Sequence, residues 1–139
     1  MRLAETAVLR VERILVLCDD LRRQETVGEI LEPEGYDVMT IAWDPLALGI
    51  VLTANPELLI FDICLPEASG KDYCRQIRSK TTAVPLLILS AIKDVANVVQ
   101  LLELGADDYI TKPFSPPEFV ARVRASMRLR DIRNRKSAV

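Results

Sequence analysis

Histidine is absent from this 139-residue sequence, and its absence excludes several kinds of chemistry. Without imidazole the chain has no ordinary acid–base catalyst for neutral pH, no histidine that could carry a phosphoryl group, and no ligand for most kinds of zinc site. The three cysteines, Cys18, Cys64 and Cys74, form an odd set without metal-ligand spacing. Such a set is typical of a reducing compartment.

Long apolar runs are also missing. No run approaches the roughly 18 residues that a membrane span needs, and residues 1–12 lack a signal-peptide core. Neither a low-complexity tract nor an excess of one charge indicates disorder, since 18 basic residues face 20 acidic ones. Half of the residues are apolar, which suffices for a core at this length. The composition predicts one soluble, cytoplasmic domain without membrane contact.

The charge is unevenly distributed. Residues 122–136 hold seven basic side chains and one acidic one, which leaves about −8 on the rest of the chain. Such a segment can contact nucleic acid. No aromatic residues are interleaved for base stacking, so we favour a solvated helix end whose charges complement the helix dipole.

Short apolar runs alternate with segments of helical period. The runs predict strands over 13–18, 36–41, 58–61, 85–90 and 109–111, and the intervening segments predict helices over 21–31, 44–54, 70–79, 93–104 and 115–130. Strictly alternating elements predict an α/β fold, a flavodoxin-like (βα)5 three-layer sandwich with parallel strand order 2-1-3-4-5. We expect an N-terminal extension over 1–12, the folded domain over 13–130 and the start of a linker over 131–139.

The strand ends carry the candidate site. In a parallel sheet of this order, ligands bind beyond the carboxyl ends of the strands. The polar residues that follow strands 1, 3, 4 and 5 are Asp19, Asp20, Asp62, Ser90 and Lys112. Carboxylates brought together there repel unless a cation joins them, and oxygen ligands without histidine favour Mg²⁺.

The same set suits phosphoryl transfer. A carboxylate such as Asp62 can accept a phosphoryl group as an acyl phosphate, while Lys112 and the Ser90 hydroxyl bind phosphoryl oxygens. Each residue also has a simpler interpretation: Asp20 as a helix N-cap, Ser90 as a turn former and Lys112 as a surface charge. Their joint placement at the strand ends is what favours the chemical role.

Three segments resemble one known family. Residues 62–70 resemble the phosphoacceptor loop of bacterial response-regulator receiver domains, with Pro66 and Gly70 four and eight residues after Asp62. Residues 87–91 are similar to that family's hydroxyl-bearing strand end, and residues 105–114 to its lysine–proline signature. The resemblance covers about residues 12–130.

The resemblance implies roles for these residues. Asp62 would accept the phosphoryl group from a sensor histidine kinase. Asp19, Asp62 and the backbone carbonyl of Cys64 would bind Mg²⁺, and Lys112 would pair with the phosphoryl group. A cis peptide bond is implied between Lys112 and Pro113.

A switch is implied as well. On phosphorylation Ser90 would move toward the phosphoryl group and Tyr109 would turn inward, which would repack the face formed by segments 93–104, 109–111 and 115–130. The alternative for Tyr109 is ordinary half-buried packing in its strand.

The end of the first strand departs from the family. Receivers usually carry two consecutive acids there. When residues 14–17 are aligned with the apolar run of that strand in the family, Cys18 falls at the first acidic position and Asp19 at the second. Loss of the first acid predicts weaker Mg²⁺ binding. Asp20 could replace it as a ligand, but a side chain that caps a helix would point away from the ion. Cys18 and Cys64 would both border the pocket. A redox sensor there is disfavoured, because neighbouring carboxylates raise thiol pKa values.

Residues 115–124 resemble the winged-helix transcription-factor branch of the family. Receivers of that branch form homodimers through charged pairs on the face just described, and the matching residues are Glu103, Asp107, Asp108, Glu118, Arg122 and Arg124. Val98 stands where arginine is usual, which implies a weakened or altered dimer. Such proteins contact DNA through a separate output domain that these residues do not include, so we expect the receiver portion of a longer regulator.

Three other functions remain to be weighed. A receiver that signals by contacts alone, without phosphorylation, is the main alternative, and Cys18 motivates it. A hydrolase with an aspartate nucleophile is disfavoured, because such enzymes usually need a general acid two residues later, where this chain has Cys64. A flavodoxin-like electron carrier is disfavoured because residues 18–21 lack a phosphate-binding loop and would repel phosphate.

Overall fold

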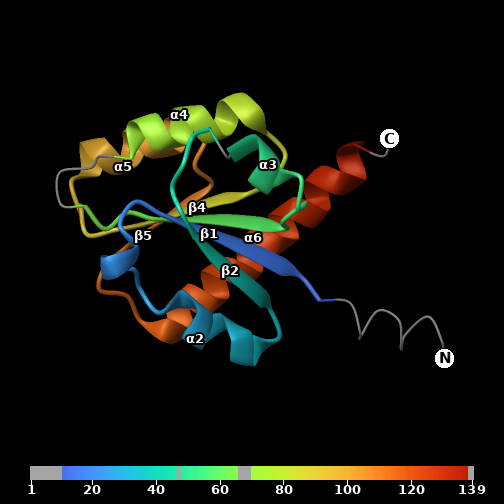
Figure 1. The fold of residues 1–139 in the computed structure, drawn as a ribbon, viewed down its shortest axis with the longest axis horizontal. Helices are drawn as coiled ribbons and strands as arrows, with labels where there is room; N and C mark the ends of the chain where they lie inside the picture. Colours follow the sequence, from blue (N-terminus) through green and yellow to red (C-terminus); the bar gives the residue numbers. More distant parts are fainter. Residues whose placement is uncertain (1–10, 47, 66–69, 138–139) are drawn as a thin grey trace.

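Five parallel strands form one sheet. The computed structural model describes residues 11–46, 48–65 and 70–137. The strands are β1 (Arg13–Cys18), β2 (Asp37–Ala42), β3 (Leu58–Asp62), β4 (Leu86–Ser90) and β5 (Asp108–Thr111). Their spatial order is β2-β1-β3-β4-β5 (Figure 1). The predicted fold class and strand order are confirmed.

Helices cover both faces of this sheet. They are α2 (Val27–Leu31), α3 (Leu48–Leu52), α4 (Lys71–Lys80), α5 (Val95–Glu103) and α6 (Pro116–Ser137). In Figure 1, α3, α4 and α5 lie on one side of the sheet, and α2 and α6 lie on the other. Short 3-10 helices occupy Leu21–Arg23 and Glu32–Glu34.

The core consists of two apolar layers, one on each face of the sheet. Strand side chains alternate between the layers, because successive residues of a strand point to opposite faces. Beneath α2 and α6 lie Ile14, Val16, Ile60, Leu87, Leu89, Phe119 and Val123. Beneath α3, α4 and α5 lie Leu15, Leu17, Phe61, Ile88, Leu48, Ile77 and Leu101. Burial on both faces explains why the central strands read as continuous apolar runs.

Two predicted helices are shorter than expected. The segment 21–31 is not one helix, because it breaks into Leu21–Arg23 and Val27–Leu31. Between them the backbone N–H of Glu25 donates to the Asp62 carboxylate at 2.7 Å, a bond that a continuous helix would redirect. The segment 44–54 yields only Leu48–Leu52, and the Asp44 carboxylate instead accepts from the N–H of Leu46 at 2.9 Å.

The last helix is longer than expected. It was predicted to end near residue 130 but continues to Ser137, through most of the expected linker. The extra turns are tied to the domain by Arg133, whose guanidinium contacts the Asp107 carboxylate at 2.5 Å. Arg78 of α4 binds the same carboxylate at 2.8 Å, and the N–H of Leu86 donates to it at 2.9 Å. Asp107 therefore joins α4, β4 and α6.

Some predicted features fall on residues that the structure does not describe. Most of the expected N-terminal extension (1–10), Pro66 and the last two residues of the expected linker lie outside the described ranges. Among the described residues, none of the helices combines the length and the apolar composition that a bilayer crossing requires.

Neutralising Asp107 should destabilise the fold. The side chains of Asp107 and Arg78 are only 12% and 13% exposed, so Asp107→Asn leaves a largely buried guanidinium without this counter-charge. We expect a loss of about 3 kcal/mol in the free energy of unfolding, measured with urea. The matched control is Asp72→Asn, whose carboxylate pairs with Arg75 at 3.1 Å on the surface and should cost less than about 1 kcal/mol. Equal losses in the two variants would contradict the prediction.

Candidate functional site

The carboxyl ends of the strands meet at one edge of the sheet. In the strand register Cys18 of β1 lies opposite Asp62 of β3, and Asp62 lies opposite Leu89, the neighbour of Ser90 in β4. Ser90 in turn pairs with Thr111 of β5, which precedes Lys112. The backbone thus brings together four chain segments that are far apart in sequence.

Asp62 and Lys112 form the centre of the site. The Asp62 side chain is fully buried, and its Oδ1 atom is in direct salt-bridge contact with the Lys112 ammonium. Its Oδ2 atom accepts the N–H of Glu25 at 2.7 Å. Lys112 also donates to the backbone carbonyl of Ile63 at 3.2 Å. The Asp62 carboxylate is therefore held in one orientation by partners from two other segments.

Lys112 stays charged despite its burial. Burial alone would lower the pKa of Lys112, but the hydrogen bond and the negative charge of Asp62 outweigh it and raise the pKa above its usual value. The lysine is fully protonated at neutral pH and supplies a fixed positive charge beside the carboxylate. The Lys112–Pro113 peptide bond is cis, as the resemblance implied.

Asp19 holds the loop that follows β3. Its Oδ1 atom accepts the N–H of Cys64 at 2.7 Å, and its Oδ2 atom accepts the N–H of Leu65 at 3.3 Å. The Tyr73 hydroxyl also donates to Oδ2 at 3.4 Å, and the Tyr73 ring stacks on Phe61. Both carboxylate oxygens of Asp19 are thus occupied by hydrogen-bond donors.

Asp20 caps the first 3-10 helix. Its carboxylate accepts from the backbone N–H of Arg22 at 3.1 Å and pairs with the guanidinium groups of Arg22 and Arg23. The hydrogen bond from the Arg22 side chain lowers the pKa of Asp20. The helix-cap interpretation of Asp20 is confirmed, and its oxygens face these arginines.

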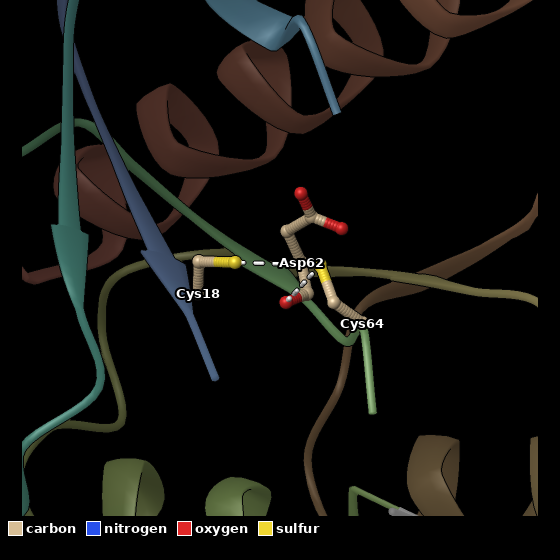
Figure 2. A group of neighbouring side chains, drawn as sticks. All are labelled: Cys18, Asp62 and Cys64. Carbon is tan, nitrogen blue, oxygen red and sulfur yellow. Dashed lines mark hydrogen bonds between the residues drawn. The ribbon is translucent and has the colours of Figure 1, made fainter. Parts of the chain in front are cut away.

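Two cysteines lie beside Asp62. The Sγ atoms of Cys18 and Cys64 are 3.3 Å apart, and Figure 2 shows both sulfurs directed toward one another next to Asp62. Among the described residues, the thiol and carboxylate donors of Cys18, Asp62 and Cys64 lie within 4.8 Å of one another. The Lys112 ammonium lies 3.7 Å from the Cys64 sulfur.

Both thiols are protonated at neutral pH. Burial raises the pKa of Cys18, an effect that its hydrogen bonds with Cys64 and the Asp20 carbonyl only partly offset. Burial raises the pKa of Cys64 strongly, and the hydrogen bond with Cys18 and the charge of Asp62 raise it further. A raised pKa leaves little reactive thiolate, which agrees with the prediction that disfavoured a redox sensor at these two cysteines.

Ser90 and Tyr109 lie farther along the same edge. Ser90 is buried, and its hydroxyl oxygen accepts the N–H of Ile92 at 3.1 Å. The half-buried Tyr109 hydroxyl donates to the carbonyl of Ile92 at 2.7 Å. Both residues therefore bind the segment between β4 and α5, so a movement of either would be transmitted to that segment.

The expected dimer residues make contacts within the chain. Arg122 binds Asp108 at 3.1 Å and Glu118 at 3.1 Å, and Arg124 reaches Glu34 at 3.4 Å. Asp107 is taken up by Arg78 and Arg133, and Glu103 is exposed on α5. Asp107 therefore has a role inside the domain, and its expected place at a dimer face stays a prediction.

Two contributors to the site escaped the sequence analysis. The N–H of Glu25 binds Asp62 through the backbone, which no residue type reveals. Tyr73 reaches Asp19 from the first turn of α4, and its only signal was an aromatic residue three positions after Gly70. Gly70 adopts φ +89°, and a Cβ there would lie 2.6 Å from Ile63, which explains why that position of the loop carries glycine.

A family model for the response regulator receiver domain matches residues 14–124. The chain belongs to the response regulator receiver family. It is 44% identical over 120 residues to the DNA-binding response regulator MtrA of Mycolicibacterium paratuberculosis, covering 86% of this chain and 53% of MtrA. This receiver chain thus spans about half the length of the curated relatives it matches. Receiver domains are signalling modules, so the chain is not an enzyme.

Solved receiver structures share this architecture. A protein described as a response regulator of Chloroflexus aurantiacus J-10-fl superposes with a TM-score of 0.72 at 32% identity, covering 85% of this chain and 98% of that one. The BeF3-activated receiver domain of DrrB superposes with a TM-score of 0.65 at 29% identity, covering 86% and 99%.

The donor set fits Mg²⁺ poorly. Magnesium requires oxygen ligands in near-octahedral geometry. Here a sulfur occupies the first acidic position, and both oxygens of Asp19 accept backbone N–H groups. In the group formed by Cys18, Asp62 and Cys64, Asp62 is the one residue with a carboxylate. These donors differ from the all-oxygen ligand set that Mg²⁺ prefers.

Removing the Asp19 carboxylate should loosen the loop after β3. We expect Asp19→Ala to lower the free energy of unfolding by about 1–3 kcal/mol, because the N–H groups of Cys64 and Leu65 lose their acceptor. Amide hydrogen exchange at Cys64 should accelerate in parallel. The control Tyr73→Phe removes the 3.4 Å hydroxyl contact but keeps the Asp19 carboxylate as acceptor for the N–H groups of Cys64 and Leu65, and it should leave exchange at Cys64 nearly unchanged. Unaltered exchange in Asp19→Ala would refute the role assigned to this carboxylate.

Proposed function

We propose that the chain is the phosphoacceptor domain of a two-component response regulator, and that a sensor histidine kinase transfers a phosphoryl group to Asp62. The observation that carries the proposal is the buried contact between Asp62 and Lys112 at the carboxyl edge of the sheet. A carboxylate nucleophile needs a fixed orientation, which the N–H of Glu25 and Lys112 provide.

The transfer needs little else from the protein. An oxygen of Asp62 bonds to phosphorus as the bond to the donor breaks, which leaves an acyl phosphate on Asp62. Lys112 then neutralises part of the phosphoryl charge, and the Ser90 hydroxyl donates to another phosphoryl oxygen after it leaves Ile92. Positioning and electrostatic stabilisation supply most of the rate in such reactions.

Labelling with a small-molecule phosphodonor such as acetyl phosphate tests the assignment. The wild-type chain should gain one phosphoryl group, detected by intact mass, and Asp62→Asn should gain none. Lys112→Ala should label at least roughly tenfold more slowly, because one charge contact to the phosphoryl group is lost. Asp44→Asn serves as the control, since Asp44 is exposed and its side chain only supports a turn. Equal labelling of Asp62→Asn and wild type would disprove the assignment.

We propose that Mg²⁺ binds this chain only weakly. The ligands would be Asp19, Asp62 and the backbone carbonyl of Cys64, with Asp20 excluded by its arginine partners. Replacement of the first acid by Cys18 removes an oxygen that would otherwise hold the hydrated ion in place.

Restoring that acid should restore the affinity. Cys18→Asp is expected to tighten Mg²⁺ binding by roughly 10–100-fold. The fluorescence of Trp43 can report the titration, because its ring lies 5.2 Å from that of Phe61, the residue before Asp62. Cys18→Asn matches the shape of aspartate without its charge and should give no gain. Unchanged affinity in Cys18→Asp would show that the cysteine does not limit Mg²⁺ binding.

The output would pass through α5, β5 and α6. Phosphorylation would draw Ser90 inward and release Tyr109 from Ile92, changing the packing of α5. Exposed Val95, Val99 and Leu102 give α5 an apolar surface. Together with Glu118 and Arg122 this surface supports a homodimer that would control a DNA-binding output domain of a longer protein, as the name of MtrA indicates for that relative.

A second candidate is a receiver that signals through protein contacts without phosphorylation. The sulfur at Cys18 and the occupied oxygens of Asp19 favour it, because both oppose Mg²⁺ binding. Absence of labelling in wild type and in Cys18→Asp alike would select this second function.

A further inference from the structure

Two sulfurs and one carboxylate form a group of possible metal ligands at the proposed phosphorylation site. Cys18 ends β1, Asp62 ends β3, and Cys64 follows two residues later, so the pairing of β1 with β3 fixes all three. Figure 2 shows the two sulfurs facing one another beside Asp62. Their donor atoms lie within 4.8 Å of one another, and a single ion can therefore reach all three.

We propose that Cys18, Cys64 and Asp62 form a binding site for a thiophilic divalent cation, with Zn²⁺ as the physiological ion. Zinc is bound by thiolate and carboxylate ligands with tetrahedral geometry, whereas magnesium avoids sulfur. Three protein ligands and one water complete such a site.

Binding of the ion requires two local adjustments. One Asp62 oxygen must exchange its contact with Lys112 or with the N–H of Glu25 for the ion, and the two sulfurs must separate slightly. Two thiolates at a zinc–sulfur distance of about 2.3 Å in a tetrahedron are roughly 3.8 Å apart, and the sulfurs of Cys18 and Cys64 are 3.3 Å apart. A side-chain rotation that separates them by a few tenths of an ångström admits the ion. Cys64 also lines an open pocket of about 360 Å³ with Glu25, Ala91 and Lys112, which gives the ion a path from solvent.

Charge balance favours a doubly charged ion. The negative charge of the Asp62 carboxylate and the positive charge of the Lys112 ammonium cancel each other before binding. Binding of Zn²⁺ releases the two thiol protons to solvent, so the two thiolates cancel the charge of the ion. Lys112, 3.7 Å from the Cys64 sulfur, then stabilises that thiolate as a hydrogen-bond donor.

Metal binding itself does not depend on the proposed function, but the effect of the metal on phosphorylation rests on it. An ion held by Cys18, Cys64 and Asp62 takes the Asp62 oxygen that Mg²⁺ would bind, so the zinc-bound chain lacks the Mg²⁺ that assists phosphorylation and accepts no phosphoryl group. Zinc would thereby act as an inhibitor of the receiver, in place of the Mg²⁺ that supports phosphorylation in ordinary family members.

Cobalt substitution tests the site independently of phosphorylation. The full chain, kept reduced with a phosphine, is titrated with Co²⁺ and then with Zn²⁺. We expect one Co²⁺ per chain, a sulfur-to-cobalt charge-transfer band, tetrahedral visible bands that Zn²⁺ displaces, and release of two protons per ion in weak buffer.

Serine substitutions identify the ligands. Cys18→Ser and Cys64→Ser should each weaken Co²⁺ binding at least roughly tenfold and reduce the charge-transfer band. Cys74→Ser is the matched control, because Cys74 is buried between α4 and α5 with its sulfur 3.8 Å from the Leu101 carbonyl, and it should bind Co²⁺ like wild type. Circular dichroism verifies that each variant folds. A wild-type spectrum without the sulfur band, or undiminished binding by folded Cys18→Ser, would overturn the site.

Labelling with acetyl phosphate tests the inhibition. Stoichiometric Zn²⁺ should suppress labelling of wild type, a chelator should restore it, and Cys64→Ser should label equally with and without Zn²⁺. Equal labelling of zinc-bound and zinc-free wild type would overturn the inhibitory role. If the metal-free chain accepts no phosphoryl group at all, the proposed function fails, while the cobalt spectra still decide the metal site.

Discussion

The buried ion pair between Asp62 and Lys112 is the interaction on which the rest of the site depends. A fully buried carboxylate is costly to desolvate, and it persists here because an ammonium and a backbone N–H both face it. The two partners come from segments after β5 and before α2, so the pair forms only when the whole sheet edge has assembled. Folding and the preparation of the reactive group are therefore one event.

The second constraint is the chemistry of the donors around that pair. By resemblance, the family has an acidic residue where this chain has Cys18. The Asp19 carboxylate accepts hydrogen bonds from the N–H groups of the loop after β3. Together Cys18 and Cys64 place two soft sulfur donors beside the Asp62 carboxylate. The preference of a site for a metal follows from its donor atoms, and here these no longer favour the ion that the fold would suggest.

Most of the fold could be predicted from the sequence, because β1, β3 and β4 are buried on both faces and read as apolar runs between breaks. The site followed from the rule that strand ends meet at one edge. The helix over 21–31 was predicted wrongly, since the Glu25 backbone bonds to Asp62 instead of continuing the helix. The resemblance placed Cys18 and Cys64 at the pocket, but their direct contact could not be predicted, because they are 46 positions apart and meet only through strand pairing.

The clamp at Asp107 has a mechanical consequence. Because one carboxylate holds Arg78 of α4 and Arg133 of α6 and sits at the entrance to β5, these elements are coupled at a single point. Arg133 lies four residues before the end of α6, so the same carboxylate that precedes β5 also fixes the direction of the last helical turn.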